Sequence, residues 1–425
     1  MSDSLLFNKP LDSFMQEQFY YLDEDITGNK RLFFENSGGS LRLKNVVQAD
    51  ARIASYPDCP ERLHDMALEI RKIIENGLND VRIMLNATSG SILPIDTASR
   101  AMFEMIGSFS QATAGGNIVT TALEHPSAYD ACVHYADLHK KELRVAEADP
   151  LTGTVLTKSI IELIDKDTNL LAFVATSNIT GAILDIPEIV KQARAINPEM
   201  YIVIDAVQYA PHGVVDLEKW DVDGLNIAPY KMFGNRGMAF AYISERAASI
   251  THLKLAAAPA DKWGLGSPAP AHYAGFSEIV NYICTLGSYV SESTDRREQY
   301  VNGMTLIEDR ERALHTFLLH GDQDTPGLLQ LDGLTVHFKD QPLERKDFIV
   351  GLSFDDLSWS KAVELYTKKG VLVYERLATS YYSKRILESV QLEGLIRVSP
   401  LHCHTLDDMR TFIHITQSLL RVNGR

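Results

Sequence analysis

The sequence predicts an α/β protein with a mostly parallel sheet that is covered by helices on both faces. Three short apolar runs carry this prediction, because each is bounded by Asp, Gly or Pro residues, as buried strands are; they span residues 201–204, 225–228 and 238–243. Upstream of them, strand-like and helical patterns alternate, which is typical of parallel strands joined by crossover helices. After about residue 291 the pattern changes, and we expect a smaller α+β C-terminal domain.

The N-terminal part begins with an expected arm and short strand within residues 1–45, followed by a helix over 61–77 that ends at Gly77. A strand is then expected at 82–85. After a loop of small residues, a second helix is predicted to begin near Pro94, which suits a first helical turn. Its apolar stripe comprises Ile95, Ala98, Met102, Met105, Ile106 and Phe109.

The middle and C-terminal parts supply the remaining predicted elements. Because residues 238–243 follow the preceding strand after only a short turn, this strand can pair antiparallel with its neighbour. Further strands are expected at 117–121, 170–175, 334–338, 348–354, 371–374 and 395–400, and helices at 158–165, 185–196, 275–286, 293–318 and 359–369.

The composition excludes several classes of protein. Apolar residues make up 45% of the 425 residues and charged residues 23%, as in ordinary globular proteins. The formal net charge of −15 argues against nucleic acid or an anionic membrane surface as a partner. The chain has no transmembrane stretch and no basic secretory signal. Its four cysteines, Cys59, Cys132, Cys284 and Cys403, lack paired or metal-binding spacing, so we expect no metal and a cytoplasmic location.

An acid and a lysine follow two of the predicted strands. Asp205 and Lys231 lie just past strand ends, where ligands bind in open α/β sheets. Pyridoxal phosphate requires both groups: a lysine that holds its aldehyde as a Schiff base, and a carboxylate that keeps its pyridine nitrogen protonated. The lysine must also be desolvated, so that its neutral amine is available. Either residue alone is more often a surface cap. Gln208 can donate to the phenolic oxygen of the cofactor, and Tyr230, Met232 and Phe233 supply apolar cover.

This segment resembles the signature of the class V aminotransferases, the cysteine-desulfurase-like branch of the fold-type I pyridoxal-phosphate enzymes. The family pattern is Asp-x-x-Gln, then Ala-Pro-His, and then Lys followed by an aromatic residue and Gly. The chain has Asp205, Gln208, Ala210-Pro211-His212 and Lys231-Met232-Phe233-Gly234, with Ala228, Pro229 and Tyr230 in place of the usual Ser and His.

The resemblance implies a fold-type I architecture with a seven-stranded sheet and pyridoxal 5'-phosphate as cofactor. It divides the chain into an N-terminal arm (1–45) that packs on the small domain, a large cofactor-binding domain (46–290) and a small C-terminal α+β domain (291–425). The chain is then an enzyme that acts on an amino acid.

The resemblance also assigns further cofactor contacts. Ser89, Gly90 and Ser91 match the loop that holds the phosphate, expected at a helix start whose free N–H groups and dipole attract anions. His125 lies in a Glu-His-x-Ser motif whose histidine stacks on the pyridine ring and can relay protons; a single histidine is otherwise more often a packed residue. Asn178 lies in a Ser-Asn-x-Thr-Gly motif, positioned for the phenolic oxygen or the substrate carboxylate. Tyr230, beside the lysine, is expected to contact the cofactor.

Three more residues concern the substrate and the partner subunit. Arg397 lies within an apolar strand and needs an anionic partner; its guanidinium matches a carboxylate, so we expect it to hold the substrate α-carboxylate, with a structural salt bridge as the alternative. Asn36 begins a small-residue segment that lies near the substrate in the family, although such a segment is as often a simple turn. Ser267 lies in a Gly-Ser-Pro version of a motif that reaches the phosphate of the partner, which implies a homodimer with shared active sites.

The reaction remains open among three alternatives. Lys231, once released from the cofactor, becomes the general base for the Cα proton. Desulfurases of this family carry a cysteine on a mobile loop, but the corresponding residues 375–383 contain none, and Tyr381 and Tyr382 are expected to line the pocket there. We therefore expect a carbon–sulfur β-lyase without a persulfide-forming cysteine. The alternatives are an aminotransferase and a non-catalytic scaffold that inherited the fold.

Overall fold

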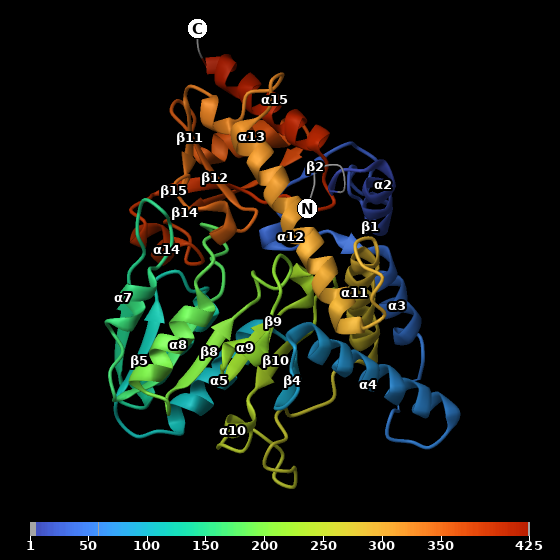
Figure 1. Ribbon diagram of the computed structural model, residues 1–425, viewed down its shortest axis with the longest axis vertical. Helices are drawn as coiled ribbons and strands as arrows, with labels where there is room; N and C mark the ends of the chain where they lie inside the picture. Colours follow the sequence, from blue (N-terminus) through green and yellow to red (C-terminus); the bar gives the residue numbers. More distant parts are fainter. Residues whose placement is uncertain (1–5, 58, 424–425) are drawn as a thin grey trace.

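The computed structural model describes residues 6–57 and 59–423. A seven-stranded sheet forms the centre of the larger part of the molecule, with strand order β4-β10-β9-β8-β7-β5-β6 (Figure 1). Within this sheet only β10 runs antiparallel to its neighbours. The strands are β4 (Ser91–Ile95), β5 (Asn117–Thr121), β6 (Glu142–Ala146), β7 (Thr168–Val174), β8 (Tyr201–Asp205), β9 (Gly224–Ile227) and β10 (Ala239–Ile243). The predicted α/β class is confirmed.

Both faces of this sheet are buried against helices. Along β7, Leu170 and Ala172 pack with one group of helices, whereas Leu171 and Phe173 pack with another. This alternation is the two-residue period of a strand covered on both sides. One face is covered by α5 (Ala98–Gln111) and α6 (Pro126–Leu138), and the other by α4 (Asp65–Leu85), α7 (Thr157–Ile161), α8 (Ile186–Ile196) and α11 (Pro270–Ser288).

The C-terminal part contains a second sheet, which is antiparallel and has the strand order β11-β12-β15-β14. It lies above the large sheet in Figure 1, and the long helix α12 runs alongside both parts. The elements are α12 (Arg296–His320), β11 (Leu334–His337), β12 (Val350–Phe354), α13 (Trp359–Lys368), β13 (Val371–Leu372), β14 (Tyr374–Leu377), α14 (Lys384–Ser389), β15 (Gly394–Val398) and α15 (Leu406–Asn423). The domain boundaries near residues 45 and 290 stay predictions.

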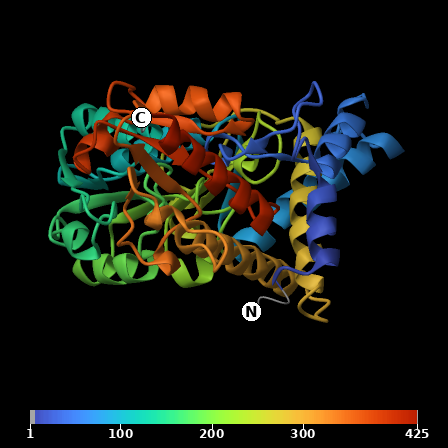
Figure 2. The ribbon, with the colours of Figure 1, turned by 90° about the horizontal axis from the view of Figure 1, so that it is seen from above.

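The N-terminal segment contacts both parts. Strand β2 (Leu32–Phe33) pairs with β13 of the C-terminal part, whereas Leu11 and Met15 of α2 (Lys9–Gln18) are buried in the core of the larger part. Figure 2 shows α3 (Lys44–Ala54) beside α11, against which it packs. The remaining short elements are β1 (Phe19–Tyr20), β3 (Arg42–Leu43), α9 (Leu217–Trp220) and α10 (Glu245–Ala248). Within residues 6–57 and 59–423, every helix is too short or too polar to cross a bilayer.

The predicted end of the first helix and the strand expected after it are both wrong. Residues 82–85 are the end of α4, not a strand, because the helix continues through Gly77. A side chain at Gly77 would meet Tyr273 of α11, with 2.6 Å between the two Cβ atoms, so this glycine allows helix contact and does not end the helix. Asn86, in the left-handed conformation at φ 53°, ends it instead.

The segment after α4 was also assigned to the wrong element. Residues 91–95 form β4, an edge strand on which Pro94 is tolerated, and the helix begins only at Ala98. Strand β6 was not predicted; it is the opposite edge strand, and its mixed exposure hides the apolar signal.

Candidate active site

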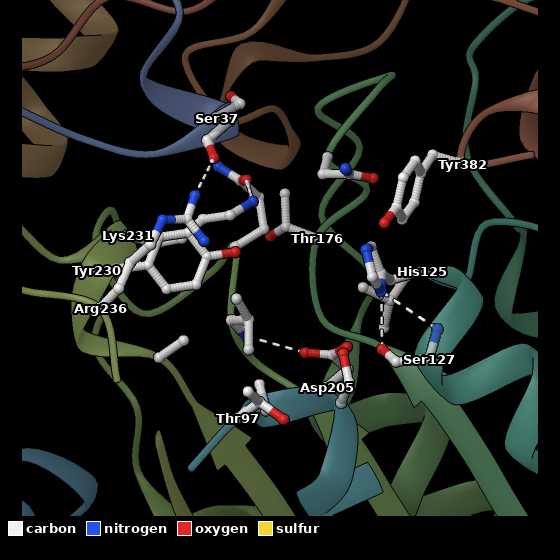
Figure 3. Close-up of a pocket in the computed structure, with 18 of the residues that line it drawn as sticks. Ser37, Thr97, His125, Ser127, Thr176, Asp205, Tyr230, Lys231, Arg236 and Tyr382 are labelled. Carbon is white, nitrogen blue, oxygen red and sulfur yellow. Dashed lines mark hydrogen bonds between the residues drawn. The ribbon is translucent and has the colours of Figure 1, made fainter. Parts of the chain in front are cut away.

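A cavity of about 490 Å³ lies at the carboxyl edge of the large sheet, where residues from the C-terminal sheet also reach it (Figure 3). Its walls come from the segments that follow β4, β5, β7, β8 and β9, as expected for a ligand site of an open α/β sheet. Of the predicted site residues, it is lined by His125, Asn178, Asp205, Gln208, Tyr230, Lys231 and Arg397.

Lys231 lies in a short 3-10 turn (Pro229–Lys231) that directly follows β9. Its Nζ donates to Oε1 of Gln208 at 2.9 Å. Burial, together with the nearby Arg397 guanidinium, lowers the pKa of Lys231 to about 7. A large fraction of the amine is therefore neutral near pH 7, as a nucleophilic lysine requires.

Asp205 is the last residue of β8 and faces the same cavity from below in Figure 3. Its Oδ1 accepts a hydrogen bond from the backbone N–H of Val207 at 3.1 Å. Burial raises the pKa of Asp205 to about 6. A protonated nitrogen heterocycle in the cavity would stabilise the ionised form of this carboxyl.

His125 caps the N-terminus of α6 and lines the cavity on the side opposite Tyr230 and Lys231 in Figure 3. Its Nδ1 accepts from the backbone N–H of Ser127 at 3.2 Å and lies 2.7 Å from the Ser127 hydroxyl. Burial, and then the Lys231 charge, lowers the pKa of His125 to about 4, so the imidazole is neutral at pH 7. The ring of Tyr382 lies 6.2 Å away from it, centroid to centroid.

The predicted phosphate loop lies elsewhere. Ser89, Gly90 and Ser91 are at the start of β4, whereas the cavity is at its end, and Ser91 pairs with Ile243 at the distant end of β10. The reason is the helix–strand misassignment described above. The helix N-terminus that faces the cavity belongs to α5, and Asp96, Thr97, Ala98 and Ser99 line the cavity there. The sequence signal was the apolar run 92–95 followed by a Thr97 cap.

Arg397, on β15, is fully buried and already has an anionic partner. Its Nη2 donates to the two carboxylate oxygens of Glu35 at 2.7 and 3.0 Å, and Nη1 donates to the carbonyl oxygen of Asn178 at 2.7 Å. The salt-bridge alternative is therefore present, although the side chain also lines the cavity. Arg376 of β14 lines the same cavity and was not predicted.

Asn36 and Ser267 do not reach the cavity of their own chain. The Asn36 amide donates to the carbonyl oxygens of Phe33 and Ser399, and its oxygen accepts from the Leu41 N–H. These backbone contacts occupy the side chain, and the neighbouring Ser37 and Gly38 line the cavity instead, so the substrate contact of Asn36 stays a prediction. Ser267 is exposed in the segment before α11, and its contact with a partner subunit stays a prediction.

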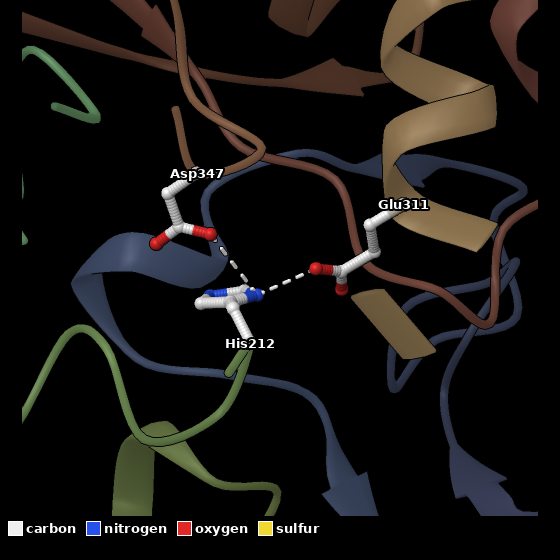
Figure 4. A group of neighbouring side chains, drawn as sticks. All are labelled: His212, Glu311 and Asp347. Carbon is white, nitrogen blue, oxygen red and sulfur yellow. Dashed lines mark hydrogen bonds and ion pairs between the residues drawn. The ribbon is translucent and has the colours of Figure 1, made fainter. Parts of the chain in front are cut away.

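His212, Glu311 and Asp347 form a cluster (Figure 4) that contacts the side chain of Gln208. Nε2 of Gln208 donates to Oδ2 of Asp347 at 3.3 Å and lies 3.3 Å from Nε2 of His212. Nδ1 of His212 lies 2.8 Å from Oε2 of Glu311 and 3.4 Å from Oδ1 of Asp347. Burial disfavours the imidazolium, but Asp347 and Glu311 outweigh it and raise the pKa of His212 to about 9. Asp347 and Glu311 come from distant segments, so the sequence alone gave no sign of this cluster.

A family model described as "Aminotransferase class-V" matches residues 32–412. The chain belongs to the class V aminotransferase family. This confirms the predicted resemblance and identifies the chain as an enzyme of that family. Among curated relatives, a probable cysteine desulfurase of Borreliella burgdorferi is 25% identical over 336 residues, which cover 72% of this chain and 78% of the relative. The cysteine desulfurase-like protein ustD of Aspergillus flavus is 23% identical over 422 residues, or 95% of this chain and 90% of the relative.

Solved structures show the same fold. The cysteine desulfurase of Thermococcus onnurineus NA1 superposes with a TM-score of 0.76 at 19% identity and covers 92% of this chain and 95% of its own. The cysteine desulfurase CsdA of Escherichia coli has a TM-score of 0.78 at 17% identity, with 98% and 99% covered. In this member of the family, all four cysteines are free in the described residues, and none lines the cavity.

Proposed function

We propose that the chain is a pyridoxal-phosphate-dependent enzyme that acts on an amino acid, and that it is a β-lyase for carbon–sulfur or related bonds. The observation that carries the proposal is the position of Lys231 and Asp205, two buried groups with shifted pKa values that line one cavity. Such shifts are typical of catalytic groups.

The residues in the cavity fit the cofactor. Lys231 would hold its aldehyde and Asp205 its ring nitrogen. The N–H groups at the start of α5, near Thr97 and Ser99, would hold its phosphate. The Thr176 hydroxyl is buried at the cavity wall and lacks a hydrogen-bond partner among the described residues, which supports a polar ligand there. When bound, pyridoxal phosphate would draw electrons away from the Cα atom of an attached amino acid.

The protein groups would then perform the remaining steps. Lys231 carries a lowered pKa, so that after release from the cofactor its Nζ can remove the Cα proton. Gln208 fixes the position of Nζ through their 2.9 Å contact. His125, on the opposite wall, would cover one face of the ring, and its low pKa keeps it neutral there. Asn178 and Tyr230 would add contacts at the ring edge.

The choice of a lyase rests on the loop before α14. Residues 378–383 contain no cysteine, so a persulfide mechanism on this loop is not available, and Tyr382 lines the cavity instead. Direct elimination of a β-substituent needs no thiol. The curated relatives named above are desulfurases or desulfurase-like, which supports carbon–sulfur chemistry.

An aminotransferase is the second candidate, because it also needs no thiol in the loop. Incubation of the purified protein with cofactor and L-cysteine separates the two: release of pyruvate and sulfide without a keto acid supports the lyase. Amino transfer that depends on added keto acid supports the aminotransferase. If neither reaction is observed with any of a panel of amino acids, the result would favour a non-catalytic scaffold.

We also propose that the enzyme is a cytoplasmic homodimer in which Ser267 of each subunit reaches the cavity of the other. Its exposure in this chain is compatible with such a contact. Sedimentation tests the assembly, and an active monomer would contradict it.

A further inference from the structure

Two arginines project from neighbouring strands into the cavity. In the C-terminal sheet, Tyr374 pairs with Arg397 and Arg376 pairs with Leu395. Side chains alternate along a strand, and directly opposite residues share a face, so Arg376 and Arg397 are diagonal neighbours on one face. Both line the cavity. Two like charges in this arrangement repel each other unless anions neutralise them.

Their charges are neutralised unequally. Arg397 has the Glu35 carboxylate and the Asn178 carbonyl oxygen as acceptors. Arg376 has no hydrogen-bond acceptor and no ion-pair partner among the described residues, and its Nε is buried and unsatisfied. Burial, and then the Arg397 charge, lowers the pKa of Arg376 to about 10, and the more distant Glu35 carboxylate opposes this only in part, so Arg376 stays a cation at pH 7. Arg376 is partly buried, with its Nε enclosed, so part of its charge is desolvated, and a ligand that brings an anion would compensate for this.

The acidic groups that line the cavity, Asp96 and Asp205, and the neighbouring Glu35 are already assigned. Glu35 is paired with Arg397, Asp205 is placed for the cofactor nitrogen under the proposed function, and Asp96 lies beside the N-terminus of α5. None of them makes a hydrogen bond or ion pair with Arg376. An amino acid brings one α-carboxylate, for which Arg397 still has its unsatisfied Nε. Arg376 then remains free for a different anionic group.

We propose that Arg376 binds a second anionic group on the substrate, so that the enzyme prefers an amino acid with a short acidic side chain. This inference rests on the proposed function, because it assigns the substrate class of the same cavity. A carboxylate or a sulfinate on Cβ has the required chemistry, since the guanidinium accommodates either with two parallel hydrogen bonds. Because Arg376 and Arg397 are diagonal neighbours on one face of the sheet, the two anionic groups that they bind must lie close together, which favours a short side chain.

L-Aspartate and L-asparagine provide a matched test, because they have nearly the same shape and differ in one charge. The wild-type holoenzyme is expected to bind L-aspartate about 10- to 100-fold more tightly than L-asparagine, measured by calorimetry. Arg376→Met should abolish this preference, whereas Arg376→Lys, which keeps the charge, should retain part of it. Arg397→Met is the control, because loss of an α-carboxylate contact weakens both ligands by the same factor. L-Cysteine sulfinate should behave as L-aspartate does.

Succinate and its half-amide succinamate extend the test to ligands that lack an amine. Wild-type protein should bind succinate more tightly, and Arg376→Met should remove the difference. Equal affinity for L-aspartate and L-asparagine in the wild type, or an Arg376→Met variant that weakens both alike, would overturn the inference and assign Arg376 to the α-carboxylate. The proposed function fails separately, if the wild-type protein forms no coloured, Lys231-dependent adduct with the cofactor.

Discussion

The amine of Lys231 lies 2.9 Å from the side-chain oxygen of Gln208, and the amide nitrogen of Gln208 lies 3.3 Å from the Asp347 carboxylate. Lys231 and Gln208 follow strands of the large sheet, whereas Asp347 precedes β12 of the C-terminal sheet. The carboxylate accepts from the amide nitrogen, so the amide oxygen faces the lysine. The position of the reactive amine thus depends on contacts between the two parts of the molecule.

Replacement of Lys231 tests the proposed function most directly. Lys231→Ala should abolish the yellow colour of the bound cofactor and the turnover of amino acids, because no other amine lines the cavity in the described residues. Lys346→Met is a matched control: Lys346 is also buried, and burial lowers its pKa to about 8, but its Nζ donates to the Phe338 carbonyl oxygen outside the cavity. That variant should stay yellow. A yellow Lys231→Ala protein would refute the assignment.

The position of the phosphate site can be tested with two serines. Ser99 lines the cavity at the start of α5, and Ser91 lies at the opposite end of β4. Ser99→Ala should weaken cofactor binding about 5- to 10-fold through the loss of one hydrogen bond to the phosphate, whereas Ser91→Ala should leave it unchanged. Fluorescence titration of the cofactor-free protein measures both constants. If Ser91→Ala weakens cofactor binding and Ser99→Ala does not, the phosphate is held by the loop that was predicted from the sequence.

The elements that sequence patterns predicted well are those with local signals. The strands that end at Asp205 and before Lys231 are buried on both faces, so short, mainly apolar runs mark them, and the direction of the strands predicts at which edge of the sheet the two residues lie. The resemblance to the family added His125 and Asn178, which have no distinctive local pattern of their own.

The errors have a different origin, because they depend on contacts between distant residues. Gly77 reads as a helix end unless Tyr273 is known to pack against it. The contact of Asn36 with the carbonyl oxygen of Ser399, 363 residues away, was likewise not predicted. The partners of Gln208 and Arg397 come from equally distant segments. Periodicity and capping rules carry no information on such pairs.

The contact at Gly77 predicts a stability effect. Gly77→Ala would place a methyl group 2.6 Å from Cβ of Tyr273, so α4 and α11 must separate, and we expect a loss of about 1–3 kcal/mol in unfolding free energy. Gly266→Ala is the control, since a Cβ there meets no atom within 4 Å. Urea unfolding of both variants provides the comparison. A Gly77→Ala protein as stable as the wild type would show that the two helices do not pack this closely.

The His212 cluster predicts a pH dependence of stability. The pKa of His212 is about 9 in the folded protein, above its ordinary value of 6.5, so the folded state binds the proton more tightly than the unfolded state. The resulting stabilisation is fully present below pH 6.5 and is lost as the pH rises through 9, and it amounts to roughly 3 kcal/mol.

Lys231 contributes with the opposite sign, because its lowered pKa makes stability increase between about pH 7 and 10. The two contributions partly cancel in the wild type, so the difference between wild type and variant is the informative quantity. His212→Gln, which keeps a hydrogen-bond donor near Glu311 and Asp347, should destabilise the cofactor-free protein at pH 6 and much less at pH 9.5, as measured by urea unfolding. A destabilisation that is the same at both pH values would mean that His212 is neutral in the folded protein and contributes packing alone.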